Sequence, residues 1–341
     1  MDRRVARPED LPPLELRRLR ELDLDAPSGP GRAAHISAAS GVVQRADFVY
    51  VVGDDELFLG VFEVSTDVPG RLERVLSGDL PTDRDGRKGA KPDLEALTVL
   101  PPFEEHPHGA LLGLGSGSTP ARDRGFVWGL AADGSLEGQA REIDLAPLYS
   151  LLRGQVKELN IEGAAVMGDQ LWLLQRGNSE LGANVVAELA LSDVMGSLLR
   201  DRTFAAAELQ RVRAYDLGEL DGVKLTFSDA SPLGGELLVF TASAESSGDT
   251  YEDGAILGSV VGTIDRDGEV RRLRTIDRAY KVEGVHATLD TGVMTLTFVC
   301  DQDDPDVASP LLSATMPLAD GVEHGAAPPG RGAPAPRERA G

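Results

Sequence analysis

The chain has 341 residues, 39 of them glycine, and a formal net charge of −22. An acidic chain of this kind repels phosphate backbones and anionic bilayers, so we expect neither a nucleic-acid nor a membrane partner. Cys300 is the only cysteine, which excludes an internal disulfide and a cysteine-based zinc site. The start has no apolar signal region and no stretch approaches the roughly 18 apolar residues of a membrane span, so we expect a cytoplasmic location.

A pair of strand-like runs recurs five times along the chain. The first runs begin near residues 37, 94, 161, 227 and 282. Each turns back into a second apolar run, and a third follows it, at 57–64, 126–130, 184–191, 256–264 and 311–316. Four units continue into a charged, alternating fourth run, at 71–76, 141–145, 212–217 and 271–276. The fifth unit lacks one, and the matching run lies at the other end of the chain, in 16–24.

These runs predict an all-β fold, a five-bladed β-propeller in which an N-terminal strand completes the last blade. Small residues in the first runs suit the crowding near a narrow axis. Six blades are the alternative, if 192–210 contains further strands; we interpret that segment as a short helix or loop. We expect one propeller domain over 15–319, a disordered N-terminus over 1–14, and a disordered tail rich in Pro, Ala and Gly over 320–341.

The repeat also predicts where polar side chains gather. In a four-stranded blade, the start of the first strand and the end of the second open on the same side of the disc, near the axis. Strand starts contribute Glu95, Glu162, Asp229 and Glu283, and strand ends contribute Ser116, Arg176, Asn178 and Asp301. Four acids within about 8 Å would repel by about 12 kcal/mol in total at an effective dielectric of about 20. Something must offset this repulsion.

Two offsets are visible in the sequence. A divalent cation, Ca²⁺ above all, takes six to eight oxygen ligands, and a ring of strand ends supplies them. Lysines also stand near the acids: Lys91 before Glu95, Lys157 before Glu162, Lys224 before Asp229 and Lys281 before Glu283. These lysines would either pair with the acids or, with Arg176, Asn178 and Ser116, bind an anionic substrate. The sequence leaves both roles open.

The motifs Asp93-Leu-Glu-Ala, Asn160-Ile-Glu-Gly and Lys281-Val-Glu-Gly, together with Arg176-Gly-Asn178, resemble those of bacterial propeller families, described as esterase-like phytases or left without a function. The resemblance covers roughly residues 16–318. It implies a calcium-dependent phosphoester or ester hydrolase with one axial metal, and places Glu95, Glu162, Asp229 and Glu283 in the inner ring. In contrast to secreted phytases, we expect this chain to have no signal peptide, which argues against phytate itself as the substrate.

The resulting hypothesis is a hydrolase of a small anionic phosphoester, ester or lactone. A Ca²⁺-type ion would be held by Glu95, Glu162, Asp229, Glu283 and Asp301. Glu162 or Glu283 would act as the base, and Arg176 would hold the anionic group. A non-catalytic scaffold that binds a ligand or a basic protein segment is the alternative, because propellers serve both purposes. The oligomeric state is left open.

Overall fold

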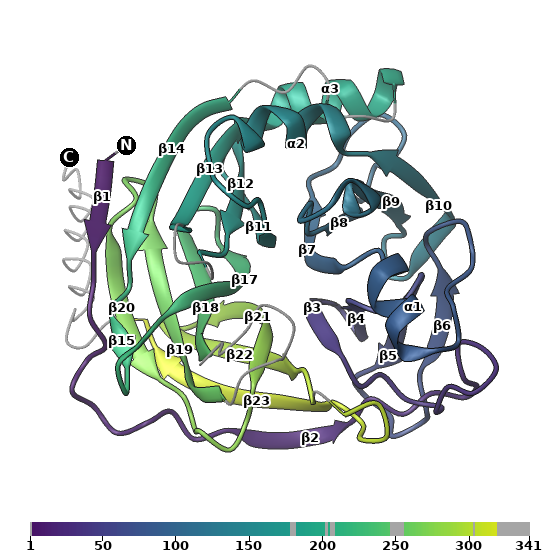
Figure 1. Ribbon diagram of the computed structural model, residues 1–341, viewed down its shortest axis with the longest axis horizontal. Coiled ribbons are helices and arrows are strands. Elements are labelled where there is room, and N and C mark those ends of the chain that lie inside the picture. Colours follow the sequence, from purple (N-terminus) through teal and green to yellow (C-terminus); the bar gives the residue numbers. More distant parts are fainter. Residues whose placement is uncertain are drawn as a thin grey trace, which may run out of the picture.

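The computed structural model describes residues 2–177, 182–201, 204, 209–245, 256–302 and 304–318. Five antiparallel sheets stand around a central axis, so the predicted five-bladed propeller is confirmed (Figure 1). Blade 1 contains β3 (Ala39–Arg45), β4 (Phe48–Gly53), β5 (Phe58–Glu63) and β6 (Arg71–Arg74). Blade 2 contains β7 (Leu94–Leu100), β8 (Ala110–Gly115), β9 (Arg124–Leu130) and β10 (Leu136–Asp144).

The remaining blades follow in chain order. Blade 3 contains β11 (Ile161–Met167), β12 (Gln170–Gln175), β13 (Asn184–Ala190) and β14 (Leu209–Asp216). Blade 4 contains β17 (Thr226–Leu233), β18 (Leu237–Glu245), β19 (Ile256–Asp265) and β20 (Val270–Thr275). Blade 5 contains β21 (Val282–Asp290), β22 (Val293–Cys300) and β23 (Pro310–Pro317). Its outer strand is β2 (Arg17–Glu21), which pairs antiparallel with β23, as the sequence predicts.

The helices and the smaller strands lie in the connections between these strands. They are α1 (Arg84–Ala90), the 3₁₀ turn η1 (Pro120–Arg122), α2 (Ala146–Arg153), α3 (Leu191–Asp201) and the hairpin of β15 (Glu219–Leu220) and β16 (Val223–Lys224). The expectation of a helix or loop after residue 192 is borne out by α3. No helix among the described residues is long and apolar enough to cross a bilayer.

The N-terminal segment differs from the disorder expected for 1–14. Strand β1 (Asp2–Val5) adds to β14 in parallel, as a fifth strand of blade 3. The Glu9 amide then donates to Leu273 O (2.7 Å), and the Leu14 amide donates to Thr275 O (2.8 Å), both on β20. Residues 2–21 therefore form a belt around the outside of blades 3, 4 and 5 (Figure 1). Its prolines are tolerated because outer edges need only partial pairing. The predicted tail lies outside the described residues.

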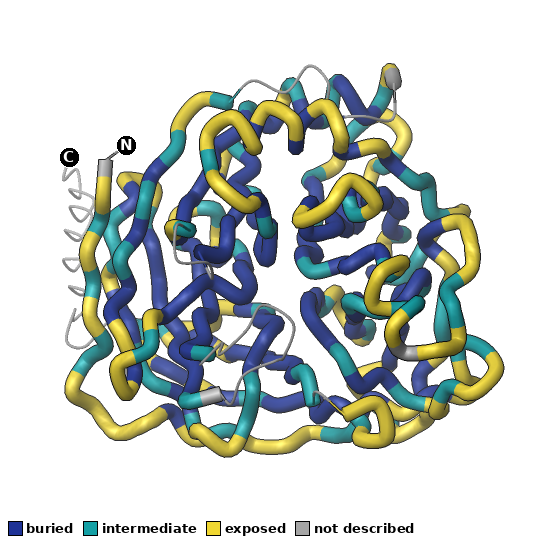
Figure 2. The backbone as a smooth tube through the Cα atoms, viewed as in Figure 1, coloured by how far each residue is buried: buried dark blue, intermediate teal, exposed yellow. Residues whose placement is uncertain are grey.

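The core lies between the faces of neighbouring blades, and the strands nearest the axis are buried almost throughout (Figure 2). The inner strands contact one another in a closed ring, in the order β3, β7, β11, β17, β21 and back to β3. Gly41, Gly163 and Gly284 make this approach feasible. A Cβ atom at these positions would come within 2.8, 2.8 and 2.5 Å of backbone atoms of the neighbouring inner strand. The small residues expected near the axis are thus explained by backbone contact.

A β-bulge interrupts the first residues of every inner strand. In each blade, two residues of the inner strand stand opposite one residue of the second strand. The extra residue is left out of the ladder and its side chain is re-aimed. The five extra residues are Ser40, Glu95, Glu162, Ser228 and Glu283. Because the bulge recurs five times, the ring presents five equivalent positions on one face of the disc.

Candidate functional site

A cavity of about 390 Å³ opens on that face. It is lined by inner-strand starts and second-strand ends, as the repeat predicts. Eight carboxylates and four cationic groups line it, so acidic groups outnumber basic ones by four. The acids are Asp54, Asp93, Glu95, Glu158, Glu162, Glu245, Glu283 and Asp301, and the cations are Lys91, Arg122, Arg176 and Lys281. We call this the axial cavity.

Three of the five bulges deliver a glutamate to the axial cavity. Burial raises the pKa of Glu162 to about 7, and Arg176 offsets this only in part. Burial likewise raises the pKa of Glu283 to about 8, against the opposing effect of Lys281. The pKa of Glu95 lies well above its usual range because of burial and then of Glu162 nearby. Burial therefore favours the protonated form of all three glutamates, and Glu162 and Glu283 titrate near neutral pH, where an exposed glutamate would be ionised.

On one side of the cavity, Lys91 stands among three acids. Its Nζ pairs with Asp54 Oδ2 and lies 2.9 Å from Asp93 Oδ1. Burial raises the pKa of Asp54 to about 7 despite Lys91. Glu95 is the third acid, and its carboxylate has no hydrogen bond or ion pair within the part of the chain that the structure describes. We call Lys91, Asp54, Asp93 and Glu95 the Lys91 cluster.

On the other side, Lys281 stands among three further acids. Its Nζ lies 3.0 Å from Asp301, 3.6 Å from Glu283 and 3.9 Å from Glu245. Burial opposes ionisation of Glu245, but Arg176 and Lys281 together lower its pKa. We call Lys281, Asp301, Glu283 and Glu245 the Lys281 cluster. Of the four lysines expected near the acids, Lys91 and Lys281 thus pair with carboxylates of the axial cavity.

Arg176 connects the second cluster to blade 3. Its Nη2 lies 2.6 Å from Glu245, and its Nη1 lies 3.4 Å from Glu162 Oε1. Asn160 Nδ2 donates to the same Glu162 oxygen at 2.5 Å. The other oxygen of Glu162, Oε2, has no hydrogen-bond partner in the described segments. One edge of this carboxylate is fixed and the other faces the cavity.

Asp229 lies just below the axial cavity and does not line it. The bulge of blade 4 falls on Ser228, so Asp229 occupies the next position, where other blades have glycine or alanine. Its side chain is fully buried, and Oδ2 accepts a hydrogen bond from the Val285 amide of blade 5 at 2.8 Å. Oδ1 has no partner among the described residues. Burial raises the pKa of Asp229 well above its usual range.

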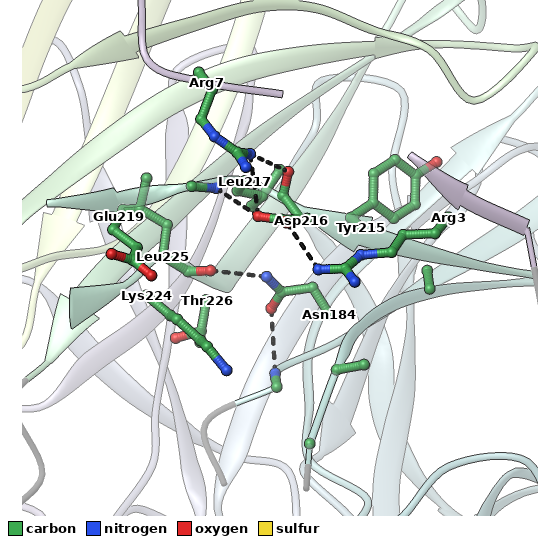
Figure 3. A pocket seen from close by; sticks show the side chains of 15 residues that line it. Arg3, Arg7, Asn184, Tyr215, Asp216, Leu217, Glu219, Lys224, Leu225 and Thr226 are labelled. Atoms are coloured by element: carbon green, nitrogen blue, oxygen red, sulfur yellow. Dashed lines mark hydrogen bonds and ion pairs between the residues drawn. The ribbon is translucent and has the colours of Figure 1, made fainter. Parts of the chain in front are cut away.

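The other predicted residues lie in different places. Ser116 is buried at the rim of the Lys91 cluster and donates to Asp93 Oδ2 at 2.5 Å. Lys157 is exposed and lies outside the cavity lining. Lys224 is exposed on β16 and lines a second pocket, between blades 3 and 4 (Figure 3). Asn178 lies outside the described residues.

Two cavity residues carry a backbone signal that the sequence analysis missed. Asp93 and Glu158 both have a φ of 55°, in the left-handed region that residues other than glycine seldom adopt. Such conformations concentrate at functional sites. Asp93 also receives Arg122 Nη1 at 2.7 Å, a further contact that sequence spacing did not indicate.

Backbone hydrogen bonds tie the rim of the cavity from blade to blade. The Asp93 amide donates to Asp54 O (2.9 Å), and the Ile161 amide donates to Ser116 O (2.7 Å). The Gln302 amide donates to Ser37 O at 3.0 Å, which joins blade 5 to blade 1. A rim held in this way fixes the polar side chains without a ligand.

The Lys91 cluster has the donor set of a hard divalent cation. One oxygen each from Asp54, Asp93 and Glu95 lies within 4.8 Å of the others. Two oxygens on one Ca²⁺ stand at most about 5 Å apart, since each bond is about 2.5 Å. Glu95 offers two oxygens that no described group engages, whereas Lys91 already holds both aspartates. The residues therefore fit a cation, provided that Lys91 moves aside.

Sequence comparison identifies a family but no characterised relative. A sequence model described as "Family of unknown function (DUF6929)" matches residues 35–316, well over half of the chain. This match does not confirm the resemblance to phytases. No curated protein matches the sequence.

Comparison with solved structures returns other proteins at low identity. Glutaminyl cyclase of Myxococcus xanthus matches at a TM-score of 0.44 and 12% identity, over 89% of this chain and 100% of its own. The α-L-arabinofuranosidase of Podospora anserina matches at 0.48 and 9%, over 90% and 98%. The Malassezia sympodialis allergen Mala s 1 matches at 0.45 and 10%, over 85% and 98%. At these values, function must be argued from the site.

Proposed function

Because the chain belongs to the DUF6929 family of unknown function, we propose a function from its own geometry: cation-dependent hydrolysis of a small ester or lactone in the axial cavity. One observation carries this proposal. Three equivalent bulges bring Glu95, Glu162 and Glu283 to one cavity, and their surroundings raise all three pKa values, those of Glu162 and Glu283 to about 7 and about 8. Carboxyl groups with different pKa values in one pocket are the usual basis of acid–base catalysis.

The residues divide into three roles. Asp54, Asp93 and Glu95 would hold the ion, Ca²⁺ being the candidate that best fits an all-oxygen set. A bound ion would polarise the carbonyl of the ester. Glu162, with a pKa of about 7 and one unengaged oxygen, would accept a proton from the attacking water.

The reaction then closes with a second proton transfer. As the water oxygen bonds to the carbonyl carbon, the bond to the leaving oxygen breaks. Glu283 has a pKa of about 8 and is mostly protonated at pH 7, so it would give its proton to that oxygen. The products are an acid and an alcohol, or one hydroxy acid from a lactone. Glu162 and Glu283 therefore take opposite roles.

The charge of the cavity favours an uncharged reacting group. All four cationic side chains that line it contact carboxylates, and acids outnumber them by four. A phosphoester would bring further negative charge into this field. Of the three substrate classes expected from the sequence, the ester and the lactone therefore suit the cavity better than the phosphoester does.

A panel of neutral esters, lactones and phosphoesters, assayed with Ca²⁺ and with EDTA, tests the proposal. We expect turnover of at least one ester or lactone, its loss in EDTA, and a fall of at least about 100-fold in Glu162→Gln. Lys157→Gln is the matched control, since Lys157 is exposed outside the cavity. Hydrolysis that survives both EDTA and Glu162→Gln would contradict the assignment.

The excess of carboxylates also supports a second candidate function, binding of a cationic ligand without catalysis. An organic ammonium or guanidinium group would be attracted by the same field. Binding of such a compound, measured by calorimetry, in a protein inert toward the whole panel would favour this alternative. Competition between the compound and Ca²⁺ would place both in the axial cavity.

A further inference from the structure

A second pocket, of about 760 Å³, lies between blades 3 and 4 (Figure 3). Its walls include the start of β13, the end of β14 and the hairpin of β15 and β16, together with the belt. These strand ends open on the same side of the disc as the axial cavity, because Arg176 of that cavity directly follows the end of β12, and β13 starts on the same side. We call it the outer pocket. Its volume lies within the range of about 300–1,000 Å³ found for small-molecule sites.

One buried side chain holds the floor of the outer pocket. Asn184 Nδ2 donates to Leu225 O at 2.8 Å. Its Oδ1 accepts hydrogen bonds from the amides of Gly177 (3.2 Å) and Phe227 (3.1 Å). Asn184 thereby joins the second and third strands of blade 3 to the inner strand of blade 4. The floor is formed without a ligand, as small-molecule sites usually are.

Cationic groups gather on the walls. Arg3 Nη2 lies 2.7 Å from Asp216 Oδ2, and Arg7 Nη1 lies 3.1 Å from Asp216 Oδ1, so the two guanidinium groups approach one carboxylate from two sides (Figure 3). A guanidinium has five N–H donors, and the contacts within the described residues use one nitrogen of each. Lys224 also lines the pocket, and its side chain makes no hydrogen bond or ion pair with any described residue.

The charge balance of the outer pocket is opposite to that of the axial cavity. Arg3, Arg7 and Lys224 face two acids, Asp216 and Glu219, in a chain whose net charge is −22. Three cations with spare donors, over a preformed floor, suit a planar or tetrahedral oxyanion. We propose that the outer pocket binds the carboxylate or phosphate group of a small organic anion, with Lys224 as the principal contact. Both belt arginines add donors to the same group.

The two sites adjoin through one peptide. The side chain of Arg176 lines the axial cavity, and the next residue, Gly177, lines the outer pocket. This inference rests on the proposed function and specifies its substrate further. The substrate would be an ester or lactone whose acidic substituent lies in the outer pocket while its carbonyl lies in the axial cavity. The negative charge of an anionic substrate, as expected from the sequence, is then bound outside the axial cavity with its eight carboxylates.

Inorganic phosphate and succinate are the probes that test the outer pocket, titrated by calorimetry into the full chain at constant ionic strength. We expect binding of at least one of them, weakened fivefold or more in Lys224→Met and in the double variant Arg3→Met/Arg7→Met. Lys88→Met, at an exposed lysine of α1 outside both pockets, should bind as the parent does. Phosphate binding alone would assign a tetrahedral group, and succinate binding alone a carboxylate.

Two results would overturn the site. One is the absence of binding of either probe at 50 mM; the other is equal binding by the parent and Lys224→Met. Neither depends on catalysis, so the inference about the site can fail while the proposed hydrolysis stands, and the reverse holds too. If an ester is hydrolysed, a carboxylated and a neutral form of it should differ: Lys224→Met should raise KM for the first and leave the second unchanged. An equal effect on both would refute the substrate assignment.

Discussion

Blades 3 and 4 each carry an acid at the start of the inner strand, yet the two acids lie in different environments. Glu162 is the extra residue of a bulge and lines the axial cavity, where Arg176 and Asn160 hold it. Asp229 lies one residue beyond the bulge of blade 4 and is sealed between blades, bonded to the Val285 amide. A shift of one position moves a strand side chain to the other face. Side-chain cations pair with the acids of the axial cavity, whereas a backbone amide donates a hydrogen bond to Asp229.

Removal of a lysine that pairs with buried acids should have the largest effect on stability. Lys91→Met leaves Asp54 and Asp93 without their lysine, and a broken buried pair costs about 3 kcal/mol. Because the change also clears the cation position, added Ca²⁺ should restore at least half of the lost stability. Chemical denaturation with and without Ca²⁺ measures both. Lys281→Met is the matched control, in which we expect a similar loss with little recovery; equal recovery in both variants would argue against a cation at the Lys91 cluster.

Removal of the Asp229 carboxylate, which accepts a hydrogen bond from a backbone amide, should destabilise the protein less. Asp229→Ala strands the Val285 amide in the core, and an unsatisfied buried group costs about 2 kcal/mol. The neighbouring variant Ser228→Ala should be nearly neutral, since the buried Ser228 hydroxyl has no partner among the described residues. Urea denaturation compares the two. A larger loss in Ser228→Ala would show that blade 4 has been assigned the wrong register.

The pH dependence of stability probes the acids of the axial cavity. The pKa values of Glu162 and Glu283 are raised to about 7 and about 8 from an ordinary 4.5, so the folded protein binds more protons than the unfolded chain between these limits. Stability should therefore be full below about pH 4.5 as far as these groups are concerned, and fall as the pH rises through 7 and 8.

Glu162→Gln should flatten this fall by about 1–2 kcal/mol between pH 5 and pH 8, after allowance for coupling between the acids. Thermal melts across that range provide the measurement. Asp169→Asn, at an exposed turn residue, is the control and should leave the slope unchanged. A variant as pH-sensitive as the parent would mean that Glu162 ionises normally in the folded state.

A fourth glutamate at the bulge positions should have the smallest effect on stability. Ser40→Glu places a fourth glutamate at a bulge position that lines the axial cavity and adds one more repulsive partner, at a cost of about 1 kcal/mol at pH 8. The same charge should tighten Ca²⁺ binding severalfold, as followed by calorimetry. If Ca²⁺ binding weakened instead, the bulge of blade 1 would not supply a cation ligand to the axial cavity.

The comparison of these two acids also shows how far the sequence could lead. The repeat of strand-like runs is a property of periodicity, so blade number, blade closure by β2, and the convergence of Glu95, Glu162 and Glu283 were all predictable. The bulges were not, because an extra residue leaves no mark in an apolar pattern, and Asp229 was therefore aligned one position away from Ser228. Lys224 was predicted to lie near the acids of the axial cavity, because spacing along the chain does not reveal that the hairpin of β15 and β16 carries it outward.

Asp93 illustrates a different limit. It stands two residues before Glu95 in a motif that was noticed, but its role depends on a left-handed backbone and on Arg122, which is supplied from the turn after β8. The belt illustrates a third. Residues 2–14 look too polar and too rich in proline to pack, and they are ordered by edges that only the finished blades provide.

The belt has a consequence for biosynthesis. It leaves the ribosome before its partners, β14, β20 and β23, of which β23 comes last in the chain. Blades 1 and 2 can form during translation, since each pairs only with strands close to it in sequence. Strand β1 can pair once β14 has emerged, but β2 must wait, unpaired, until residue 317 has emerged, and only then does the circle of blades close. Chain termination before β23 would thus release a propeller that is open at the seam between its first and last blades.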